Sequence, residues 1–373
     1  MSKKLSVMWL GLRGFPEVQG GIEKHAEYIC PLLVELGCDV HVLTRTAYQP
    51  EELKTWHGVQ FHSLWSPPSR SLETIVHTFL GVLYAGFIKR PDILHIQAIG
   101  PAFWTPLARL LGLKVVITSH GSDYERQCWG FLAKSVLKIG ECVGMRCSNA
   151  RIVISKGIQK HNYSKHHAVC DLIHNGVTLP DIPDSTGHLE EFGLTPNKYI
   201  IWVSRLVPEK RHLDLIEAFR LAGLSDDWKL AIIGSSDHPD VYTEQVLDTI
   251  EKTPNVIATG FQNGLALREL YAHAHTFVLP SSHEGLSIAL LEALGYGLTV
   301  VASDIPANLE IELPEEHYFP LGNVDVLAEK LRYFTQQKVT DEQRQARRDW
   351  VAQRYNWRDI AKKTLQVYQK ALV

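Results

Sequence analysis

The 373-residue sequence has no strong excess of charge of either sign, because 38 Lys and Arg face 41 Asp and Glu for a net charge of -3. A nucleic-acid-binding protein usually carries a clear basic excess, so this balance argues against that class. The total conceals a polarity. Residues 1–180 hold 19 basic and 13 acidic side chains, and residues 181–373 hold 19 and 28. The basic half predicts an anionic partner, such as a phosphorylated substrate or a membrane surface.

Long apolar runs and paired cysteines are also missing. No window offers the roughly 20 apolar residues of a membrane-spanning helix, and the apolar stretch at 74–88 is broken by His77. The N-terminal apolar run is short, lacks a small-residue cleavage site and meets Arg13, which favours a buried strand over a signal peptide. The six cysteines form no C-x-x-C pair. This usage is typical of reduced thiols, so we expect a cytoplasmic protein.

Short apolar runs alternate with helical patterns along the whole chain. The runs are continuous in hydrophobicity, which indicates parallel strands covered by helices on both faces. We predict strands at 5–11, 39–44, 93–97, 115–119, 152–155, 199–203, 229–233, 256–259, 276–279 and 300–303. We predict helices at 22–36, 72–88, 131–145, 213–221, 242–251, 266–274, 287–294 and 357–372.

A segment rich in turn-forming residues, near 175–190, separates two series of strands and reads as a linker. The sequence therefore predicts an α/β fold of two Rossmann-like, doubly wound parallel-sheet domains that face a cleft. The boundary is expected at residue 180, and the cleft is the expected site of function.

A glycine-rich loop follows the first strand and opens a helix, with glycines at Gly11, Gly14, Gly20 and Gly21. Glycine lets the backbone approach a phosphate, and free N–H groups at a helix N-terminus favour an anion. The spacing is not G-x-G-x-x-G, no acidic ribose-binding residue follows at the usual distance, and there is no G-x-x-x-x-G-K-[ST]. A loop that merely needs left-handed turns accounts for these glycines equally well.

A basic turn follows the first strand of the second series and contains Arg205, Lys210 and Arg211. The carboxyl ends of parallel strands are where ligands bind in open α/β sheets. An Arg can chelate a phosphate with two N–H groups, and a Lys adds a mobile point charge. The turn therefore favours an anion site, with a solvated basic turn as the alternative.

An acidic pair, Glu284 and Glu292, flanks the start of a predicted helix. Eight residues span about 12 Å at helical rise, roughly the distance from a sugar to a ribose across a diphosphate. The helix N-terminus at Gly285, Leu286 and Ser287 offers N–H groups and a positive dipole end to that diphosphate. A capped helix with a buried, paired Glu is the alternative, but burying a Glu without a partner is costly.

Histidines supply two further candidates. His120 ends a strand of the first series, where it can hydrogen-bond a sugar, although a lone histidine is more often structural. The cluster His161, His166, His167 and Cys170 fits no standard zinc spacing, and its sequence, KHNYSKHH, reads as an exposed turn. We therefore predict no metal site.

Together, these motifs resemble family-four retaining glycosyltransferases, which have the GT-B fold. The E-x7-E pair, the SRLVPEK stretch and His120 carry the resemblance, and the HNGV sequence at 174–177 looks like the family's interdomain turn. The resemblance covers essentially the whole chain. The opening GLRGFPEVQGGIEKH and the later HGSDYERQCWG look most similar to bacterial surface-polysaccharide members, including rhamnosyl- and mannosyltransferases.

The resemblance implies a role for each region. Residues 181–356 would bind a nucleotide sugar, residues 1–180 would face the acceptor, and a last helix at 357–373 would pack back on the first domain. The implied catalytic residues are His120, Arg205, Lys210 and Glu284. The implied donor-binding residues are Gly20 and Gly21 in a closing loop, Phe261 at the base, Gly285, Leu286 and Ser287 at the diphosphate, and Glu292 at the ribose.

The chemistry is cleavage of a bond from an anomeric carbon to a diphosphate, so fixed cations and dipoles should stabilise the leaving group. No D-x-D occurs in the sequence, and we predict metal-independent transfer with retention and no cofactor. The family reaction is described as same-face, with the departing phosphate helping to deprotonate the acceptor. A glycan or lipid-linked saccharide is the expected acceptor, in O-antigen or capsule-type synthesis, with no nucleic-acid partner.

An aromatic and basic stretch in the first half suits a lipid-diphosphate acceptor at the anionic inner face of the cell membrane. Its residues are Tyr124, Arg126, Trp129, Phe131, Lys134 and Lys138. A solvated helix face with core aromatics is the alternative.

Two other functions remain open from the sequence. A nucleotide-sugar epimerase of the same architecture would convert the donor sugar without an acceptor. A non-catalytic nucleotide-sugar binding module would bind the donor and turn over nothing.

Overall fold

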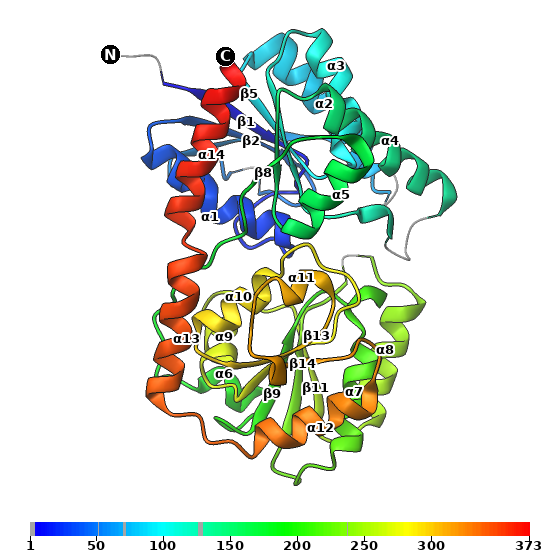
Figure 1. The fold of residues 1–373 in the computed structure, drawn as a ribbon, viewed down its shortest axis with the longest axis vertical. Helices are drawn as coiled ribbons and strands as arrows, with labels where there is room; N and C mark the ends of the chain where they lie inside the picture. The colour runs from blue at the N-terminus through cyan, green and yellow to red at the C-terminus, as the bar shows by residue number, and fades with distance from the viewer. Residues whose placement is uncertain (1–3, 51, 70–71, 126–129, 237) are drawn as a thin grey trace. The chain divides into compact units, whose positions relative to one another are not determined.

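The computed structural model describes residues 4–50, 52–69, 72–125, 130–236 and 238–373. The chain divides into two units (Figure 1). Unit 1 consists of Met1–Gly176 and Trp357–Val373, and unit 2 of Val177–Asn356. The boundary therefore falls a few residues before residue 180, for a local reason. The Val177 N–H donates to the Tyr355 carbonyl at 2.7 Å within unit 2, whereas Gly176 packs against the Trp357 ring within unit 1.

Unit 1 is built on a sheet of order β3-β4-β2-β1-β5-β6-β7-β8. Neighbouring strands are parallel, apart from the short antiparallel pair β3–β4. The strands are β1 (Ser6–Leu10), β2 (Asp39–Arg45), β3 (Thr55–Trp56), β4 (Val59–Leu64), β5 (Ile93–Gln97), β6 (Val115–Ser119), β7 (Ala150–Val153) and β8 (Asp171–Leu172).

Helices cover both faces of this sheet. They are α1 (Gly21–Glu35), α2 (Glu73–Tyr84), which continues into the π-helical η1 (Ala85–Lys89), η2 (Pro101–Trp104), α3 (Thr105–Leu110), η3 (Asp123–Glu125), α4 (Phe131–Cys147), α5 (Lys156–His166) and α14 (Trp357–Leu372). Figure 1 shows α14 beside α1, which it contacts. The Tyr368 hydroxyl on α14 lies 2.7 Å from Nδ1 of His95 on β5, which anchors this last helix to the sheet of unit 1.

The core of unit 1 explains the continuous apolar strands. Along β1, Val7 and Trp9 pack in one cluster with α1 and α14, while Met8 and Leu10 pack in another with α2, α3 and α4. Successive side chains of a strand point to opposite faces, so a strand covered on both faces must be apolar throughout. Full burial of each such side chain contributes about 1.5–3 kcal/mol.

Unit 2 is built on a sheet of order β11-β10-β9-β12-β13-β14, and the paired strands are parallel. Numbered within the unit, this order is 3-2-1-4-5-6, the doubly wound order with a switch point between the first and fourth strands. The strands are β9 (Tyr199–Val203), β10 (Lys229–Ile233), β11 (Val256–Gly260), β12 (Thr276–Leu279), β13 (Thr299–Ser303) and β14 (Tyr318–Phe319).

The helices of unit 2 are α6 (Gly187–Glu191), η4 (Pro208–Lys210), α7 (His212–Ala222), α8 (Val241–Lys252), α9 (Gly264–Ala272), α10 (Ile288–Gly295), α11 (Pro306–Leu309), η5 (Glu315–His317), α12 (Val324–Thr335) and α13 (Asp341–Arg354). The prediction of two parallel-sheet α/β domains is confirmed by both units. Among the residues that the structure describes, no helix is long and apolar enough to cross a membrane.

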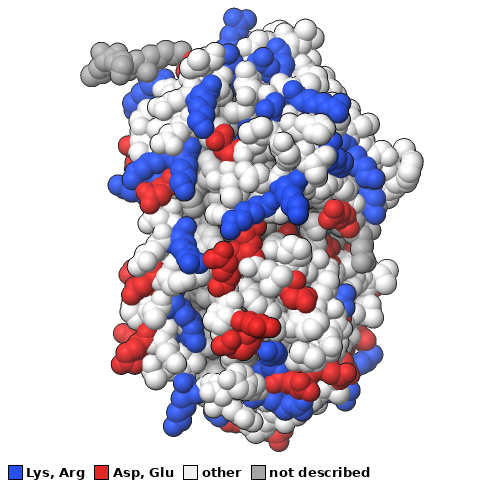
Figure 2. Space-filling view, viewed as in Figure 1, with Lys and Arg blue, Asp and Glu red and all other residues white. Residues whose placement is uncertain are grey.

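Charge is divided between the units. From the sequence, unit 1 carries 23 Lys and Arg against 14 Asp and Glu, and unit 2 carries 15 against 27. Figure 2 shows acidic side chains gathered over unit 2 on the face in view. The assignment of the last helix to unit 1 makes the polarity stronger than the division at residue 180 indicates.

The exposed turn predicted for the sequence KHNYSKHH is wrong. These residues form most of α5, which Ser155 caps by accepting from the Ile158 N–H at 3.3 Å. Asn162 is fully buried, and the buried His166 ring lies 3.0 Å from the Glu141 carboxylate. Tertiary contacts therefore stabilise a helix that its polar sequence does not indicate.

Candidate functional site

In unit 2, two loops leave the carboxyl ends of the adjacent strands β9 and β12. The loop after β12 is tied to the loop after β9, since the Ser282 N–H donates to the Glu209 carbonyl at 2.9 Å. This is the switch point of the sheet, where a ligand crevice is expected. The predicted basic turn and the predicted acidic loop are thus brought together.

A direct ion pair joins these loops. The Lys210 ammonium lies 2.5 Å from the Glu284 carboxylate, and their side chains are 18% and 9% exposed. Lys210 also lies 5.8 Å from the centre of the Trp202 ring. An ammonium has three N–H donors, and Glu284 is the hydrogen-bond acceptor that the described residues supply to it. The pair can hold an anion and a hydroxyl side by side, with Lys210 toward the anion.

Arg205 lies half-buried in the same turn, and buried hydrogen bonds fix the backbone around it. The Ser204 N–H donates to the carbonyl of Ile233 at the end of β10, at 2.9 Å, and the Leu206 N–H donates to that of Ser235, just beyond the strand, at 3.0 Å. Nε2 of the fully buried His212 lies 2.9 Å from the Ser204 hydroxyl. Burial, followed by the charge of Lys210, lowers the pKa of His212 to about 3, so the ring stays neutral while it supports the cationic turn.

The start of α10 faces the same edge of the sheet. The Ser287 hydroxyl accepts from the Leu290 N–H at 3.3 Å and caps the helix. The Leu286 side chain is buried, so Gly285 and Leu286 would meet a donor through backbone rather than side chains. The positive end of the helix dipole remains available to an anion there.

Glu292 is half-buried on α10. The Tyr271 hydroxyl donates to its carboxylate at 3.4 Å, and the Tyr271 ring stacks on Tyr296. The hydrogen bond from Tyr271 compensates for the burial of Glu292. The costly burial of a Glu without a partner therefore gives no support to a functional role here. Because α10 begins at Ile288, only half of the spacing from Glu284 is helical, and the 12 Å derived from helical rise does not describe this pair.

Phe261 lies just after β11, at the edge of the sheet, and its side chain is 39% exposed. The preceding Gly260 has a φ of 72°, a left-handed conformation that turns the chain out of the strand. An exposed aromatic ring at the carboxyl edge is suited to stacking on a planar group.

In unit 1, the glycine loop is braced by an ion pair between Arg13 and Glu23 at 3.2 Å. Arg13 also donates to the Gln19 carbonyl. Gly20 has a φ of 147°, and a Cβ there would lie 2.1 Å from the Glu23 carboxylate, whereas a Cβ on Gly21 meets nothing within 4 Å. Burial alone would raise the pKa of the Glu23 carboxyl, but Arg13 outweighs it and holds the pKa below its usual value.

His120 directly follows β6 and lies in an array of polar rings within unit 1. Its Nε2 is 2.8 Å from the Gln97 side-chain oxygen, and its ring meets His25 edge-on at 5.3 Å. His25 is buried, and its Nδ1 lies 3.0 Å from the Asn175 side-chain oxygen. Burial lowers the pKa of His25 to about 4. Gln97, His25 and Asn175 are partners that the sequence does not predict, although HNGV and GGIEKH contain two of them.

The histidine cluster in α5 serves a buried carboxylate. Glu141 on α4 is contacted by Lys165 at 2.6 Å and by His161 and His166 at 3.3 and 3.0 Å. Burial would raise the pKa of Glu141, but the bonds from Lys165 and His166 outweigh it and keep the pKa low. Within the described part of the chain, no group of His, Cys, Asp and Glu is arranged to hold a metal ion.

Part of the predicted aromatic and basic stretch cannot be followed, because Arg126 and Trp129 lie outside the described residues. Tyr124 is buried, and Lys165 contacts its hydroxyl at 3.0 Å. Phe131 and Leu132, at the start of α4, are 84% and 80% exposed. The stretch therefore combines a core aromatic with an exposed apolar helix start.

The doubly wound sheet of unit 2, with cations and a helix start at its switch point, defines a protein of the nucleotide- or phosphate-binding α/β class. Comparison with known families is more specific. Residues 188–357 match the model described as "Glycosyl transferases group 1", and residues 19–179 match "Glycosyltransferase Family 4". The chain belongs to this glycosyltransferase family, which has the GT-B fold, and the predicted resemblance is confirmed.

Individual relatives agree with this assignment. The chain is 31% identical to an alpha-maltose-1-phosphate synthase of Mycobacterium tuberculosis, over 95% of this chain and 96% of that protein. It is 24% identical to a GDP-mannose:cellobiosyl-diphosphopolyprenol alpha-mannosyltransferase of Xanthomonas campestris, over 77% and 76%. The solved structure of Anabaena HepE with UDP and glucose has the same fold, with a TM-score of 0.77, 17% identity and coverage of 98% and 99%.

Proposed function

We propose that this enzyme is a retaining, metal-independent glycosyltransferase that moves a sugar from a nucleotide-diphosphate donor to a glycan or lipid-linked acceptor in surface-polysaccharide synthesis. The observation that carries the proposal is the Lys210–Glu284 pair at the switch point of unit 2, 2.5 Å apart and beside the start of α10. The pair places a cation for a diphosphate next to a carboxylate for sugar hydroxyls.

The charge that develops during the reaction assigns a role to each of these residues. As the bond from the anomeric carbon to the diphosphate breaks, negative charge grows on the leaving oxygen. Arg205, Lys210 and the N-terminus of α10 stabilise that charge, and fixed donors of this kind contribute about 2.7–4 kcal/mol each when removed singly. Glu284 accepts from donor-sugar hydroxyls and orients the sugar, and Glu292 accepts from the ribose. His120 of unit 1 hydrogen-bonds the donor sugar.

Metal independence rests on these cations and on the absence of a D-x-D sequence. Retention is proposed from the family resemblance, with the departing phosphate accepting the acceptor's proton on the same face. The UDP and glucose bound by HepE support a nucleotide-sugar donor. The cellobiosyl-diphosphopolyprenol in the name of the Xanthomonas relative supports a lipid-diphosphate-linked acceptor.

Unit 1 is proposed as the acceptor side, at an anionic inner membrane surface. The start of α4 presents Phe131 and Leu132 to solvent, with Lys134 and Lys138 on the following turns. Exposed apolar side chains flanked by lysines are suited to the boundary between headgroups and acyl chains. The buried Tyr124 belongs to the core, so the proposed contact is limited to the beginning of α4.

One experiment separates the three candidate functions. UDP-, GDP- and dTDP-sugars are first ranked by thermal stabilisation, because a ligand at 100 times its Kd stabilises by about 2.7 kcal/mol. The best donor is then incubated with EDTA, alone and with a polyprenyl-diphosphate-linked saccharide. A transferase joins sugar to acceptor with retained anomeric configuration and hydrolyses the donor only slowly without it.

The alternatives give different results. An epimerase converts the donor sugar in the absence of acceptor, and a binding module is stabilised by the donor but forms no product. Loss of activity in EDTA would contradict metal independence, but it would not contradict the assignment as a glycosyltransferase. If no nucleotide sugar stabilises the protein at millimolar concentration, the proposed donor class is wrong.

A further inference from the structure

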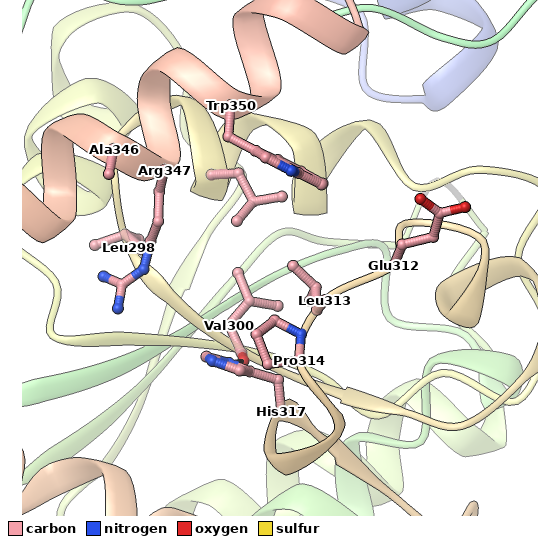
Figure 3. Close-up of a pocket in the computed structure, with 10 residues that line it drawn as sticks. Leu298, Val300, Glu312, Leu313, Pro314, His317, Ala346, Arg347 and Trp350 are labelled. Atoms are coloured by element: carbon pink, nitrogen blue, oxygen red, sulfur yellow. Dashed lines mark hydrogen bonds between the residues drawn. The ribbon is translucent and has the colours of Figure 1, made fainter.

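A mainly apolar pocket of about 540 Å³ lies within unit 2, away from the residues assigned above (Figure 3). Its apolar lining comes from the end of α10, the start of β13 and the segment before η5, through Leu294, Leu298, Val300, Leu313 and Pro314. Small-molecule sites typically occupy about 300–1,000 Å³ and have mostly apolar walls with a few polar groups. The size and lining of this pocket meet that description.

The pocket and the proposed donor site lie at opposite ends of the same elements. Val300 is at the start of β13, whereas Ser303 ends that strand and donates to the Ser281 carbonyl, beside the loop that holds Glu284, at 2.6 Å. Three residues of strand span about 10 Å. Helix α10 likewise begins at the donor loop and reaches Leu294 only near its end. The pocket is therefore a separate site.

A cation lies at one end of the pocket. Arg347 reaches it from α13, and its guanidinium donates to the Gly297 carbonyl at 3.1 Å. Across the described ranges of the chain, Arg347 forms no ion pair with a carboxylate, and the charge that shifts its pKa is that of another cation, Arg344. Burial lowers the pKa of the Arg347 guanidinium, with Arg344 adding to the effect. A half-buried cation with no counter-ion is costly, and an anionic ligand would remove that cost.

At the other end of the pocket, the charge of Glu312 is neutralised by a basic side chain. The Glu312 carboxylate lies 3.3 Å from the Arg354 guanidinium, which in turn lies 4.5 Å from the centre of the Trp350 ring. Figure 3 shows Trp350 across the pocket from Val300 and Leu313, with Arg347 and Glu312 toward opposite ends. A second negative charge on a ligand would approach Glu312, so the arrangement favours a single anionic group beside Arg347.

We propose that this pocket binds an apolar monocarboxylate, whose carboxylate pairs with Arg347 and whose body lies between Trp350 and the side chains of Val300 and Leu313. A planar carboxylate matches the fork of a guanidinium. This inference is independent of the donor chemistry proposed above.

The test uses three probes that share one ring system and differ in charge. Binding of 2-naphthoate, 2-naphthalenemethanol and 2-naphthylmethylammonium to the full-length protein is measured by calorimetry. We expect the carboxylate to bind at least about tenfold more tightly than the alcohol, a difference of about 1.4 kcal/mol, and the ammonium to bind least. Fluorine NMR of protein labelled with 5-fluorotryptophan, assigned with Trp350→Phe, should show the Trp350 signal moving with the carboxylate.

Three variants localise the effect. Arg347→Met should remove the preference for the carboxylate and keep the affinity for the alcohol within about twofold. Ala346→Trp fills the pocket from an exposed position on α13 and should weaken both probes at least about tenfold without breaking the bond to Gly297. Arg332→Met, exposed on α12 outside the lining, is the matched charge control and should change nothing.

Arg347→Lys guards against loss of structure, because it keeps the charge and should retain most of the preference. Three results would overturn the proposal: equal binding of carboxylate and alcohol by the wild type, a preference that survives Arg347→Met, or a Trp350 signal that stays fixed at millimolar 2-naphthoate.

Discussion

Each unit contains a partly buried pair of one basic and one acidic side chain near the carboxyl end of its sheet, but the two pairs are connected differently. Arg13, in the loop, and Glu23, in the first turn of α1, are ten positions apart, and they also hold the loop's own backbone through the Arg13 N–H and the Gln19 carbonyl. Lys210 and Glu284 come from two loops, 74 positions apart, and among the described residues Lys210 donates to Glu284 alone. The Arg13–Glu23 pair stabilises the loop, whereas Lys210 in the second pair has N–H donors that can bind a ligand.

The contrast predicts that the largest loss of activity comes from unit 2. Lys210→Met should lower kcat/KM for the best nucleotide sugar by about 10²–10³-fold, because it removes a fixed donor to the leaving group. Steady-state kinetics measure the loss, and thermal unfolding of the variant shows whether the fold is kept.

The matched control for that substitution is in the same turn. Arg211→Met removes a cation whose guanidinium pairs with Asp214 on α7, so its kcat/KM should stay within about threefold of wild type. Equal losses for the two variants would mean that the turn attracts the donor only through its total charge.

The second largest effect is expected at the braced loop of unit 1. Gly20→Ala forces a side chain into a φ of 147° and toward the Glu23 carboxylate, which should cost about 1–3 kcal/mol. Gly21→Ala has open space and should leave the free energy of unfolding unchanged or raise it slightly, since Ala favours a helix start over Gly. Denaturant unfolding compares the two. A loop that tolerates both changes equally would not be braced as described.

How far the sequence predicts this molecule depends on what holds each element. Strands β9, β10 and β12 occur at the predicted residues because continuous apolar runs are buried on both faces. Strand β4 was missed, since its sequence VQFHSL alternates and only one face is buried. Helix α13 was missed because it is highly polar. Its start is set by a capping box of Thr340 and Gln343, and its arginines donate to carbonyls of other segments.

In the candidate site too, some contacts could be predicted from the sequence and others could not. Lys210 and Glu284 could be brought together from the sequence, because each follows a strand and the motifs place both at one sheet edge. The His25–Asn175 contact joins residues 150 positions apart, and no periodicity or spacing signals it. The same is true of the Glu141 cluster, in which partners on α4 and α5 meet only through tertiary packing.

A third, smaller effect tests the proposed contact of unit 1 with a membrane. Lys134→Glu with Lys138→Glu should weaken binding to vesicles that contain anionic lipid, since each basic residue near such a surface contributes about 1 kcal/mol. Sedimentation with anionic and neutral vesicles measures the change. The control is Lys252→Glu on α8 of unit 2, where the native lysine is exposed and pairs with Asp248. Undiminished binding of the double variant to anionic vesicles would contradict the membrane contact.

The last expected effect concerns acid stability, to which a buried histidine of unit 1 contributes. His77 on α2 is fully buried, and its Nε2 lies 3.1 Å from the Thr44 carbonyl. Burial, followed by the charge of Arg45, lowers the pKa of His77 from 6.5 to about 4. A depressed histidine pKa means that the unfolded chain takes up the proton first. The stabilising effect of the neutral ring is therefore complete above pH 6.5 and is lost as the pH falls from 6.5 toward 4.

Replacement by an amide that does not titrate isolates this contribution. Over that range His77→Gln should flatten the dependence of unfolding free energy on pH, by up to about 1.4 kcal/mol per pH unit. His273→Gln in unit 2, whose ring bonds the Ser185 carbonyl near the surface, is the control for replacing a hydrogen-bonded histidine with glutamine. Chemical denaturation between pH 7 and pH 5 measures both slopes. An equal slope in wild type and His77→Gln would show that the His77 ring takes up its proton as readily in the folded state as in the unfolded state. Acid sensitivity would then have to come from other buried rings whose pKa values burial lowers, such as His25 and His95 in unit 1 and His212 in unit 2.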